Sequence, residues 1–223
     1  FEERVFRRFL PQGLPVPTDF QKLSVDQQNV WTLIEQSLDS KKYKAFLLHG
    51  VTGSGKTEVY LHAVRKCLEL EKTALVLVPE ISLTPQLVNR FRERFGDLVA
   101  VLHSGMDDGE RFDEWSRIQL GQAKIAIGAR SAIFAPLQNL GLVVIDEEHD
   151  QSYKQGESPR YQGRDVAVYR AFQKKTTVIL GSATPSIESW QNSRTGKYHL
   201  LELPSRALTG AKLPEVEVLD LRQ

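Results

Sequence analysis

Short apolar runs alternate with amphipathic stretches along most of the chain. Six runs have the length of buried strands: residues 45–49, 74–78, 98–102, 125–127, 142–145 and 177–180. Helical spacing of apolar positions marks residues 25–38, 57–70, 83–95, 109–120 and 164–173. Because parallel strands need long crossovers, usually helices, this order predicts an α/β domain with a mostly parallel sheet and helices on both faces. Ligands of such sheets bind at the carboxyl ends of the strands.

The two ends of the chain differ from this pattern. Residues 1–22 carry charges and then three prolines, which favour extended chain, and we interpret them as a linker from a preceding domain. Residues 23–205 form the predicted domain. Residues 206–223 contain Pro, Gly and Arg before one more β-like run at 216–219, and we interpret them as a connection that leaves the domain.

Composition excludes several classes of protein. The 223 residues include 29 Lys and Arg against 28 Asp and Glu, so any contact with nucleic acid must come from a local basic patch. The single cysteine, Cys67, forms no internal disulfide or Cys-rich zinc site, and we expect it to pack in a helix. Because no apolar run approaches the roughly 20 residues of a membrane helix and the start lacks a signal-peptide core, we expect a cytoplasmic protein.

Residues 50–57, GVTGSGKT, match the pattern G-x-x-x-x-G-K-[ST] between a predicted strand and a predicted helix. Glycines allow the tight turn whose backbone N–H groups converge on phosphates, and the helix N-terminus favours negative charge. We expect Lys56 to reach the β- and γ-phosphates and Thr57 to bind Mg²⁺. A glycine loop with a chance lysine is the alternative. The predicted nucleotide-binding residues are Gly50, Val51, Thr52, Gly53, Ser54, Gly55, Lys56 and Thr57.

The apolar run 142–145 ends abruptly in acids. Asp146 is suited to hold Mg²⁺, directly or through water, and Glu147 to orient and polarise the water that attacks in phosphoryl transfer. The pattern assigns no role to Glu148. An acidic cluster at a strand end is often only a solvated turn, so the catalytic interpretation depends on its pairing with the phosphate loop. The predicted catalytic residues are Lys56, Asp146, Glu147 and His149.

The next strand leads into the triplet S-A-T at residues 182–184. The order G-x-x-x-x-G-K-T, D-E-x-H, S-A-T resembles that of the superfamily 2 helicases, whose motor lobes are RecA-like P-loop NTPase domains. In that family the triplet links the nucleotide site to the strand-separating surface. The resemblance therefore implies that Ser182, Ala183 and Thr184, together with His149, couple hydrolysis to movement. A strand-to-helix cap by Ser and Thr is the structural alternative.

More segments resemble the bacterial replication-restart helicases of that superfamily: residues 79–86 (PEISLTPQ), 102–105 (LHSG), 128–134 (GARSAIF) and 146–154 (DEEHDQSYK). The resemblance covers residues 23–203. It implies ATP or ADP and Mg²⁺ as ligands and 3′-to-5′ unwinding of DNA. It also implies single-stranded or forked DNA, replication-restart proteins and single-strand-binding protein as partners. Residues 23–27 look like the adenine-contacting segment of the family, in which Gln27 would contact the base.

Two features of that family are not found in this sequence. Its members have a second motor lobe with an arginine that reaches the γ-phosphate, and a cysteine-rich zinc insertion. We therefore interpret residues 23–205 as a first motor lobe and residues 206–223 as a connection toward a second one. We expect no zinc site in this chain, a monomer, and weak or no hydrolysis by the chain alone, since an arginine finger contributes roughly 10³ to 10⁵ in rate.

Residues 151–177 combine six basic side chains with two acidic and four aromatic ones. Cations neutralise phosphates and aromatic rings stack on unpaired bases, a combination that suits single strands. Tyr153 and Tyr161 lie in a predicted loop and are candidates for stacking, whereas Tyr169 and Phe172 fit better as core residues of a helix. Ser82 could equally serve as a helix cap. The predicted DNA contacts are Ser82, Thr84, Gln86, Arg130, Ser131, Tyr153, Lys154, Arg160 and Tyr161.

Other functions share part of this pattern. A double-strand DNA translocase of superfamily 2 would share the nucleotide motifs but should lack the aromatic loop. A small-molecule P-loop NTPase would have an acceptor pocket and no coupling to DNA. A third alternative is a binding module without its own catalysis.

Overall fold

The structure, a computed structural model, describes residues 20–40 and 42–207. Most of the proposed N-terminal linker, and residues 208–223 with the β-like run at 216–219, lie outside the described residues. Within the described ranges, no helix is long and apolar enough to cross a membrane.

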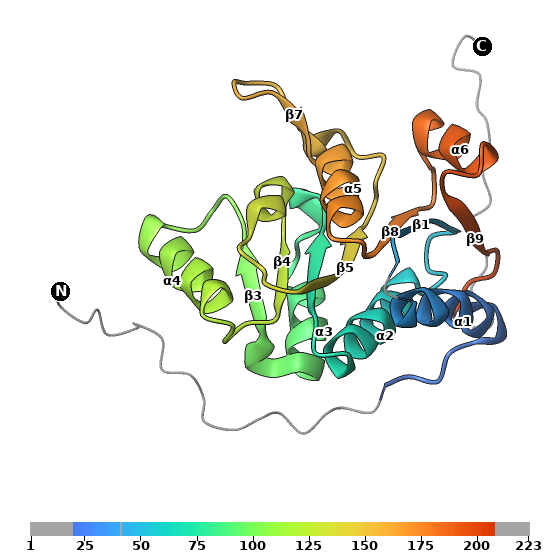
Figure 1. Ribbon diagram of the computed structural model, residues 1–223, viewed down its shortest axis with the longest axis horizontal. Coiled ribbons are helices and arrows are strands. Elements are labelled where there is room, and N and C mark those ends of the chain that lie inside the picture. Colours follow the sequence, from blue (N-terminus) through green and yellow to red (C-terminus); the bar gives the residue numbers. More distant parts are fainter. Residues whose placement is uncertain (1–19, 41, 208–223) are drawn as a thin grey trace, which may run out of the picture.

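Seven parallel strands form one sheet in the part of the chain that the structure describes, in the order β3-β4-β2-β5-β8-β1-β9 (Figure 1). This confirms the predicted fold class. The strands are β1 (Lys44–Gly50), β2 (Thr73–Leu77), β3 (Val99–Leu102), β4 (Ile125–Gly128), β5 (Leu140–Ile145), β8 (Thr177–Ser182) and β9 (His199–Leu203).

Helices cover both faces of the sheet (Figure 1). Side chains alternate along each strand, so in β1 Phe46 and Leu48 join one apolar cluster while Ala45 and Leu47 join the other. The first cluster packs under α1 (Val25–Asp39), α2 (Lys56–Glu69) and α3 (Pro85–Phe95). The second packs under α4 (Asp108–Gln119) and α5 (Gly163–Gln173), and α6 (Ile187–Arg194) contacts β1. Cys67 is buried in α2, as expected.

Short elements fill the loops at the carboxyl edge of the sheet. Three are 3-10 helices, η1 (Glu80–Ser82), η3 (Arg130–Phe134) and η4 (Gln151–Tyr153), and a fourth, η2 (Gly96–Leu98), leads into β3. The strands β6 (Lys154–Gln155) and β7 (Tyr161–Gln162) pair as an antiparallel hairpin that projects from the domain (Figure 1).

Capping residues explain where two helices begin. Ser24 and Gln27 form a reciprocal capping box at α1, in which each side chain accepts from the other's backbone N–H. Thr84 caps α3 by accepting from the N–H of Leu87. The alternative that Ser82 caps a helix is therefore wrong for α3, because Ser82 lies two residues before the capping residue Thr84, in η1.

Candidate nucleotide site and adjoining groove

The phosphate loop connects β1 to α2, as its motif predicts. Gly53 and Gly55 have φ angles of 80° and 82°, in the left-handed region that favours glycine. The Lys56 ammonium donates to the carbonyl oxygen of Gly50 over 2.9 Å and lies 3.8 Å from Glu147 Oε1. The hydroxyl of Ser54 is buried and has no hydrogen-bond partner among the described residues. The fold thus brings the lysine of the loop to the acids that follow β5.

Two tyrosines hold Asp146 at the end of β5. The Tyr60 hydroxyl donates to Asp146 Oδ1 over 3.0 Å, and the Tyr153 hydroxyl donates to the Asp146 carbonyl over 2.7 Å. Burial and the charge of Glu147 raise the pKa of Asp146, while the hydrogen bond from Tyr60 and the charge of Lys56 oppose this rise. The sequence analysis did not identify Tyr60 as part of the site.

The donor set at this edge fits Mg²⁺. This hard cation prefers oxygen ligands and binds through few protein groups, and the Asp146 carboxylate and the Thr57 hydroxyl are such groups. The repulsion between Glu147 and Asp146 that raises the Asp146 pKa is also what a bound cation would relieve.

His149 joins the acids to the triplet after β8. Its Nδ1 lies 2.8 Å from Ser182 Oγ and 3.7 Å from Glu147 Oε2, and its Nε2 lies 3.4 Å from Thr184 Oγ1. Ser182 Oγ also accepts from the Thr184 N–H. The alternative of a helix cap is wrong for these residues, because the next helix, α6, is capped by Ser186. Ala183 lies between the two hydroxyl residues and contributes no polar side-chain group.

Gln27 is buried against the phosphate loop. Its Nε2 donates to the Ser54 carbonyl over 2.9 Å, and its Oε1 accepts from the Ser24 N–H. A Cβ on Gly55 would lie 2.2 Å from Nε2, so a glycine is needed there for this close approach as well as for its φ angle. The structure places Gln27 at the nucleotide site, and its contact with adenine stays a prediction.

Glu148 is a buried anchor. Its carboxylate accepts from Arg164 Nη1 at 3.1 Å, from the N–H and hydroxyl of Ser186 at 2.7 and 3.0 Å, and from the Ser189 hydroxyl at 2.7 Å. These bonds tie the segment after β5 to α5 and to the N-terminus of α6. The third acid therefore positions the surrounding elements.

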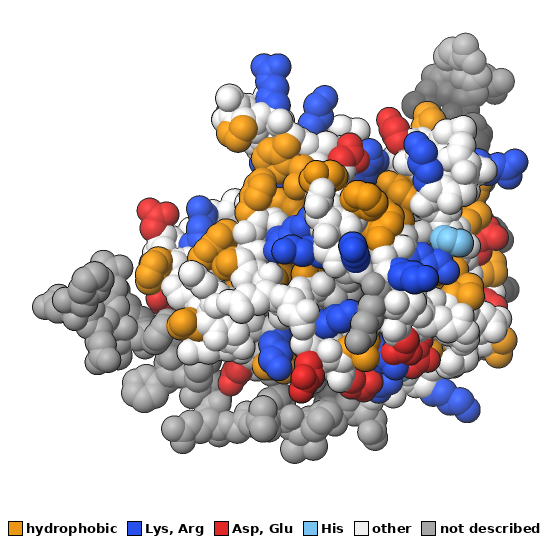
Figure 2. Space-filling model, viewed as in Figure 1, with side chains coloured by type: hydrophobic (Ala, Val, Ile, Leu, Met, Phe, Trp, Pro, Cys, Tyr) orange, Lys and Arg blue, Asp and Glu red, His pale blue; other side chains and the backbone are white. Residues whose placement is uncertain are grey.

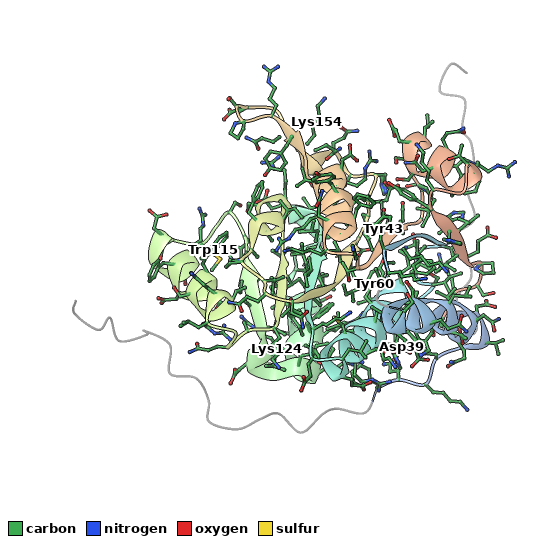
Figure 3. All side chains as sticks on the ribbon, in the orientation of Figure 1. Asp39, Tyr43, Tyr60, Trp115, Lys124 and Lys154 are labelled. Carbon is green, nitrogen blue, oxygen red and sulfur yellow. The ribbon has the colours of Figure 1, made fainter. Side chains whose placement is uncertain are left out.

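A groove of about 770 Å³ runs from His149 to the β6–β7 hairpin. Basic side chains of this region lie on the projecting hairpin and across the same face (Figure 2), and Lys154 is labelled on the hairpin in Figure 3. Both Lys154 and Arg160 are exposed, and Tyr161 packs edge-on against Phe134. The residues that line the groove include His149, Gln151, Lys154, Arg160, Tyr161, Arg164 and Glu188.

Tyr153 does not belong to this groove, so its prediction as a stacking residue is wrong. Its side chain is fully buried and its hydroxyl is bound to the Asp146 carbonyl, which leaves no ring face for a base. The opposite error applies to Tyr169 and Phe172, which were expected in the core. They are 62% and 56% exposed, because the smaller residues Ala167 and Ala171 form the buried face of α5.

The remaining predicted DNA contacts lie in η1 and at the start of α3, which follow β2, and in η3, which follows β4 at the carboxyl edge of the sheet. Arg130 Nη1 donates to the carbonyls of Ser152 and Lys154, so the guanidinium braces the base of the hairpin. Ser82 and Arg130 are half-buried, whereas Thr84, Gln86 and Ser131 are exposed. A role in DNA binding stays a prediction for Ser82, Thr84, Gln86, Arg130 and Ser131.

Comparison with known proteins agrees with this site. The family model described as DEAD/DEAH box helicase matches residues 24–193, which contain all three nucleotide motifs. The chain belongs to the DEAD/DEAH box helicase family. Membership implies ATP binding.

Two curated relatives are identical to this chain at about half of the aligned positions. The chain is 49% identical to the replication restart protein PriA of Bacillus subtilis over 221 residues, which are 99% of the chain and 27% of that protein. It is 53% identical to PriA of a Synechocystis species over 185 residues, 81% of the chain and 22% of that protein. The chain thus spans about a quarter of the length of these relatives.

A solved structure supports the fold. The chain matches RecG bound to a three-way DNA junction with a TM-score of 0.65 and 26% identity, over 86% of this chain and 25% of that one.

Proposed function

We propose that this chain is the ATP-binding first motor lobe of an ATP-dependent 3′-to-5′ DNA helicase that acts in replication restart. The observation that carries this proposal is the position of His149. Its ring contacts Glu147 and Ser182 at the nucleotide site and also lines the groove beside the basic hairpin. The similarity to the replication restart protein PriA supports the replication-restart role. The preference for forked or single-stranded DNA and the partner proteins are further parts of the proposal.

The residues of the phosphate loop would bind the nucleotide phosphates, and Thr57 and Asp146 would hold Mg²⁺. When bound, Mg²⁺ would neutralise the negative charge that develops on the phosphate oxygens. Glu147 would orient the attacking water and accept its proton. Its φ of 42° is rare for a residue with a side chain. This strained backbone holds the Glu147 carboxylate 3.8 Å from the Lys56 ammonium.

The groove offers a path for a single strand. Lys154 and Arg160 supply cationic groups for the backbone, and Tyr161 supplies a partly exposed ring for a base. A strand in the groove would lie against the exposed side of His149. A shift of that ring would reach Glu147 through the contacts at Nδ1, which would couple DNA binding to hydrolysis.

This arrangement argues against a small-molecule NTPase. Such an enzyme needs an enclosed acceptor pocket that excludes water from the transferred phosphoryl group. The groove beside the nucleotide site instead is open and lined with side chains suited to a polyanion, such as Lys154 and Arg160. Tyr161 likewise argues against a double-strand translocase, because an aromatic ring stacks on the unpaired bases of a single strand.

The experiment that tests the proposal measures the affinity of the chain for a fluorescent ATP analogue with Mg²⁺, with and without a single-stranded oligonucleotide. Coupling between two ligands is reciprocal, so a motor lobe should show the same factor in both directions of titration. Lys56→Ala should abolish nucleotide binding, and His149→Ala should retain it but lose the effect of DNA. Retained nucleotide binding in Lys56→Ala would overturn the phosphate site, and unaltered coupling in His149→Ala would overturn the proposed path.

A further inference from the structure

The segment that leaves the sheet contacts the phosphate loop at two points. β9 pairs in parallel with β1, with Leu203 in register with Gly50. The carbonyl of Leu203 accepts from the Val51 N–H over 3.3 Å, and the N–H of Ala207 donates to the Gly53 carbonyl over 2.9 Å. Residues 203–207 therefore run alongside the loop, and their backbone is hydrogen-bonded to Val51 and Gly53 in its first half.

The Ala207 bond fixes one peptide group of the phosphate loop. The carbonyl of Gly53 and the N–H of Ser54 belong to the same planar, trans peptide, so they point to opposite sides. The Ser54 N–H donates to the Val51 carbonyl over 3.0 Å, and Ala207 holds the other end of this peptide. Ala207 and Val51 thus restrain both sides of a peptide beside Gly53, where the chain has little intrinsic stiffness.

The next carbonyl of the loop is held from the other direction. Gln27 Nε2 donates to the Ser54 carbonyl. A Cβ on Gly55 would lie 2.2 Å from Gln27 Nε2, 3.5 Å from Gln27 Cδ and 3.4 Å from Ala207 Cβ, so Gln27 and Ala207 both lie close to Gly55. Two successive carbonyls of the loop are therefore bound by donors from segments 180 positions apart. Hydrogen-bond donors from outside the loop thus order the glycine turn before a phosphate binds.

We propose that residues 203–207 are a positioning element of the nucleotide site, and that the backbone N–H of Ala207 preorganises the phosphate loop by holding the Gly53 carbonyl. Ordering a glycine-rich loop costs conformational entropy, and a loop that is already ordered binds its ligand more tightly. Because the same residues lead out of the sheet, displacement of this segment weakens nucleotide binding. The inference rests on the proposed nucleotide site and adds a residue that no sequence motif marks.

The test removes the N–H of Ala207 and leaves the phosphate-binding motif intact. Ala207→Pro eliminates the donor, and Ala207→Gly retains it at the same position. The loss of one hydrogen bond of this kind corresponds to an affinity for Mg²⁺ and the ATP analogue that is about 3- to 10-fold weaker in Ala207→Pro. The affinity of Ala207→Gly should stay within about twofold of the unaltered chain.

The unfolding temperature, measured beside the affinities for ATP and ADP, separates this role from a general loss of structure. The loop binds the phosphates that ATP and ADP share, so both affinities should fall by the same factor, while the unfolding temperature without nucleotide stays unchanged. If proline perturbs folding, replacement of Ala207 by its α-hydroxy acid converts the amide to an ester and removes only the N–H. Unchanged or tighter binding by a folded variant would overturn the inference. Absence of binding by the unaltered chain would instead overturn the proposed function.

Discussion

The Tyr60 hydroxyl donates a hydrogen bond to Asp146 Oδ1 although the two residues are 86 positions apart in the sequence. Burial and the nearby charge of Asp146 raise the pKa of Tyr60 well above its usual range, so the phenol stays protonated and remains a donor. Tyr60 lies near the centre of the molecule (Figure 3). Helix α2 thus begins at the phosphate loop and, one turn later, holds the acid of the second motif.

The first prediction concerns Tyr60→Phe. The hydrogen bond from Tyr60 lowers the pKa of Asp146, so its loss should raise that pKa further. Since the ionised carboxylate is the form that binds Mg²⁺, the affinity for Mg²⁺ and the ATP analogue should decline at a higher pH in the variant than in the unaltered chain. Titration of nucleotide affinity between about pH 5 and 8 measures the shift.

A control for this effect is nucleotide affinity without Mg²⁺, which should show no such shift. If the affinity for Mg²⁺ and nucleotide declined at the same pH in both proteins, the hydrogen bond from Tyr60 would not control the ionisation of Asp146.

The second prediction concerns Gly181, which makes room for that tyrosine. A Cβ at this position would lie 1.7 Å from the Tyr60 hydroxyl oxygen and 3.4 Å from Asp146 Oδ1. Gly181→Ala should therefore displace the ring and destabilise the fold by about 1 to 3 kcal/mol, the usual cost of overpacking. Urea unfolding measures the change in free energy.

A double-mutant cycle identifies the cause of that loss. In the Tyr60→Phe background the nearest clash disappears, because the hydroxyl oxygen is gone and the ring carbon that bore it lies 2.9 Å from the added Cβ. The cost of Gly181→Ala should be smaller there by at least about 0.5 kcal/mol. Equal costs in both backgrounds would assign the effect to the backbone.

Local patterns predicted the sheet, its principal helices and the two nucleotide motifs. The apolar runs and helical spacings lie within a few residues of the observed elements because each is buried on both sides or on one regular face. The position of Lys56 relative to Glu147 also followed, since the phosphate loop and the acids both come at the carboxyl ends of strands in one parallel sheet.

Long-range contacts explain what the sequence could not predict. Tyr153 lies in a basic and aromatic segment that is typical of base stacking. Only the fold shows that its hydroxyl is bound to the Asp146 carbonyl. β9 is a five-residue strand whose partner, β1, lies about 150 positions away, and α6 spans only eight residues. Glu148 shows the same limit, because its partners come from α5 and α6.

The third prediction concerns Glu148→Gln. The amide has one acceptor oxygen where the carboxylate has two, and its NH₂ group would face the donors of Ser186 or Arg164. Removal of one partner from a buried ion pair is strongly destabilising, and we expect a loss of about 3 kcal/mol by urea unfolding. Glu188→Gln on the exposed side of α6 is the matched control and should change stability by less than about 0.5 kcal/mol. Similar values for the two variants would contradict the anchoring role.

The fourth prediction concerns the hairpin beside the groove. If Lys154 and Arg160 each contact one phosphate of a single strand, replacement by alanine should reduce the slope of log affinity against log salt by about 0.7 per residue. Tyr161→Ala should weaken binding by about 1 to 3 kcal/mol with little change in that slope, because stacking releases no counterions. Fluorescence anisotropy with a labelled oligonucleotide at several salt concentrations separates the two effects.

Lys42→Ala provides the matched control, because this exposed lysine precedes β1 at the opposite edge of the sheet from the groove. It removes the same charge from the chain, so its effect on the salt slope measures the general electrostatic contribution. A slope for Lys154→Ala equal to that for Lys42→Ala would mean that the hairpin lysine makes no specific phosphate contact. A smaller slope in Lys154→Ala and Arg160→Ala alone would place the strand along the hairpin, on the side of the groove that His149 also lines.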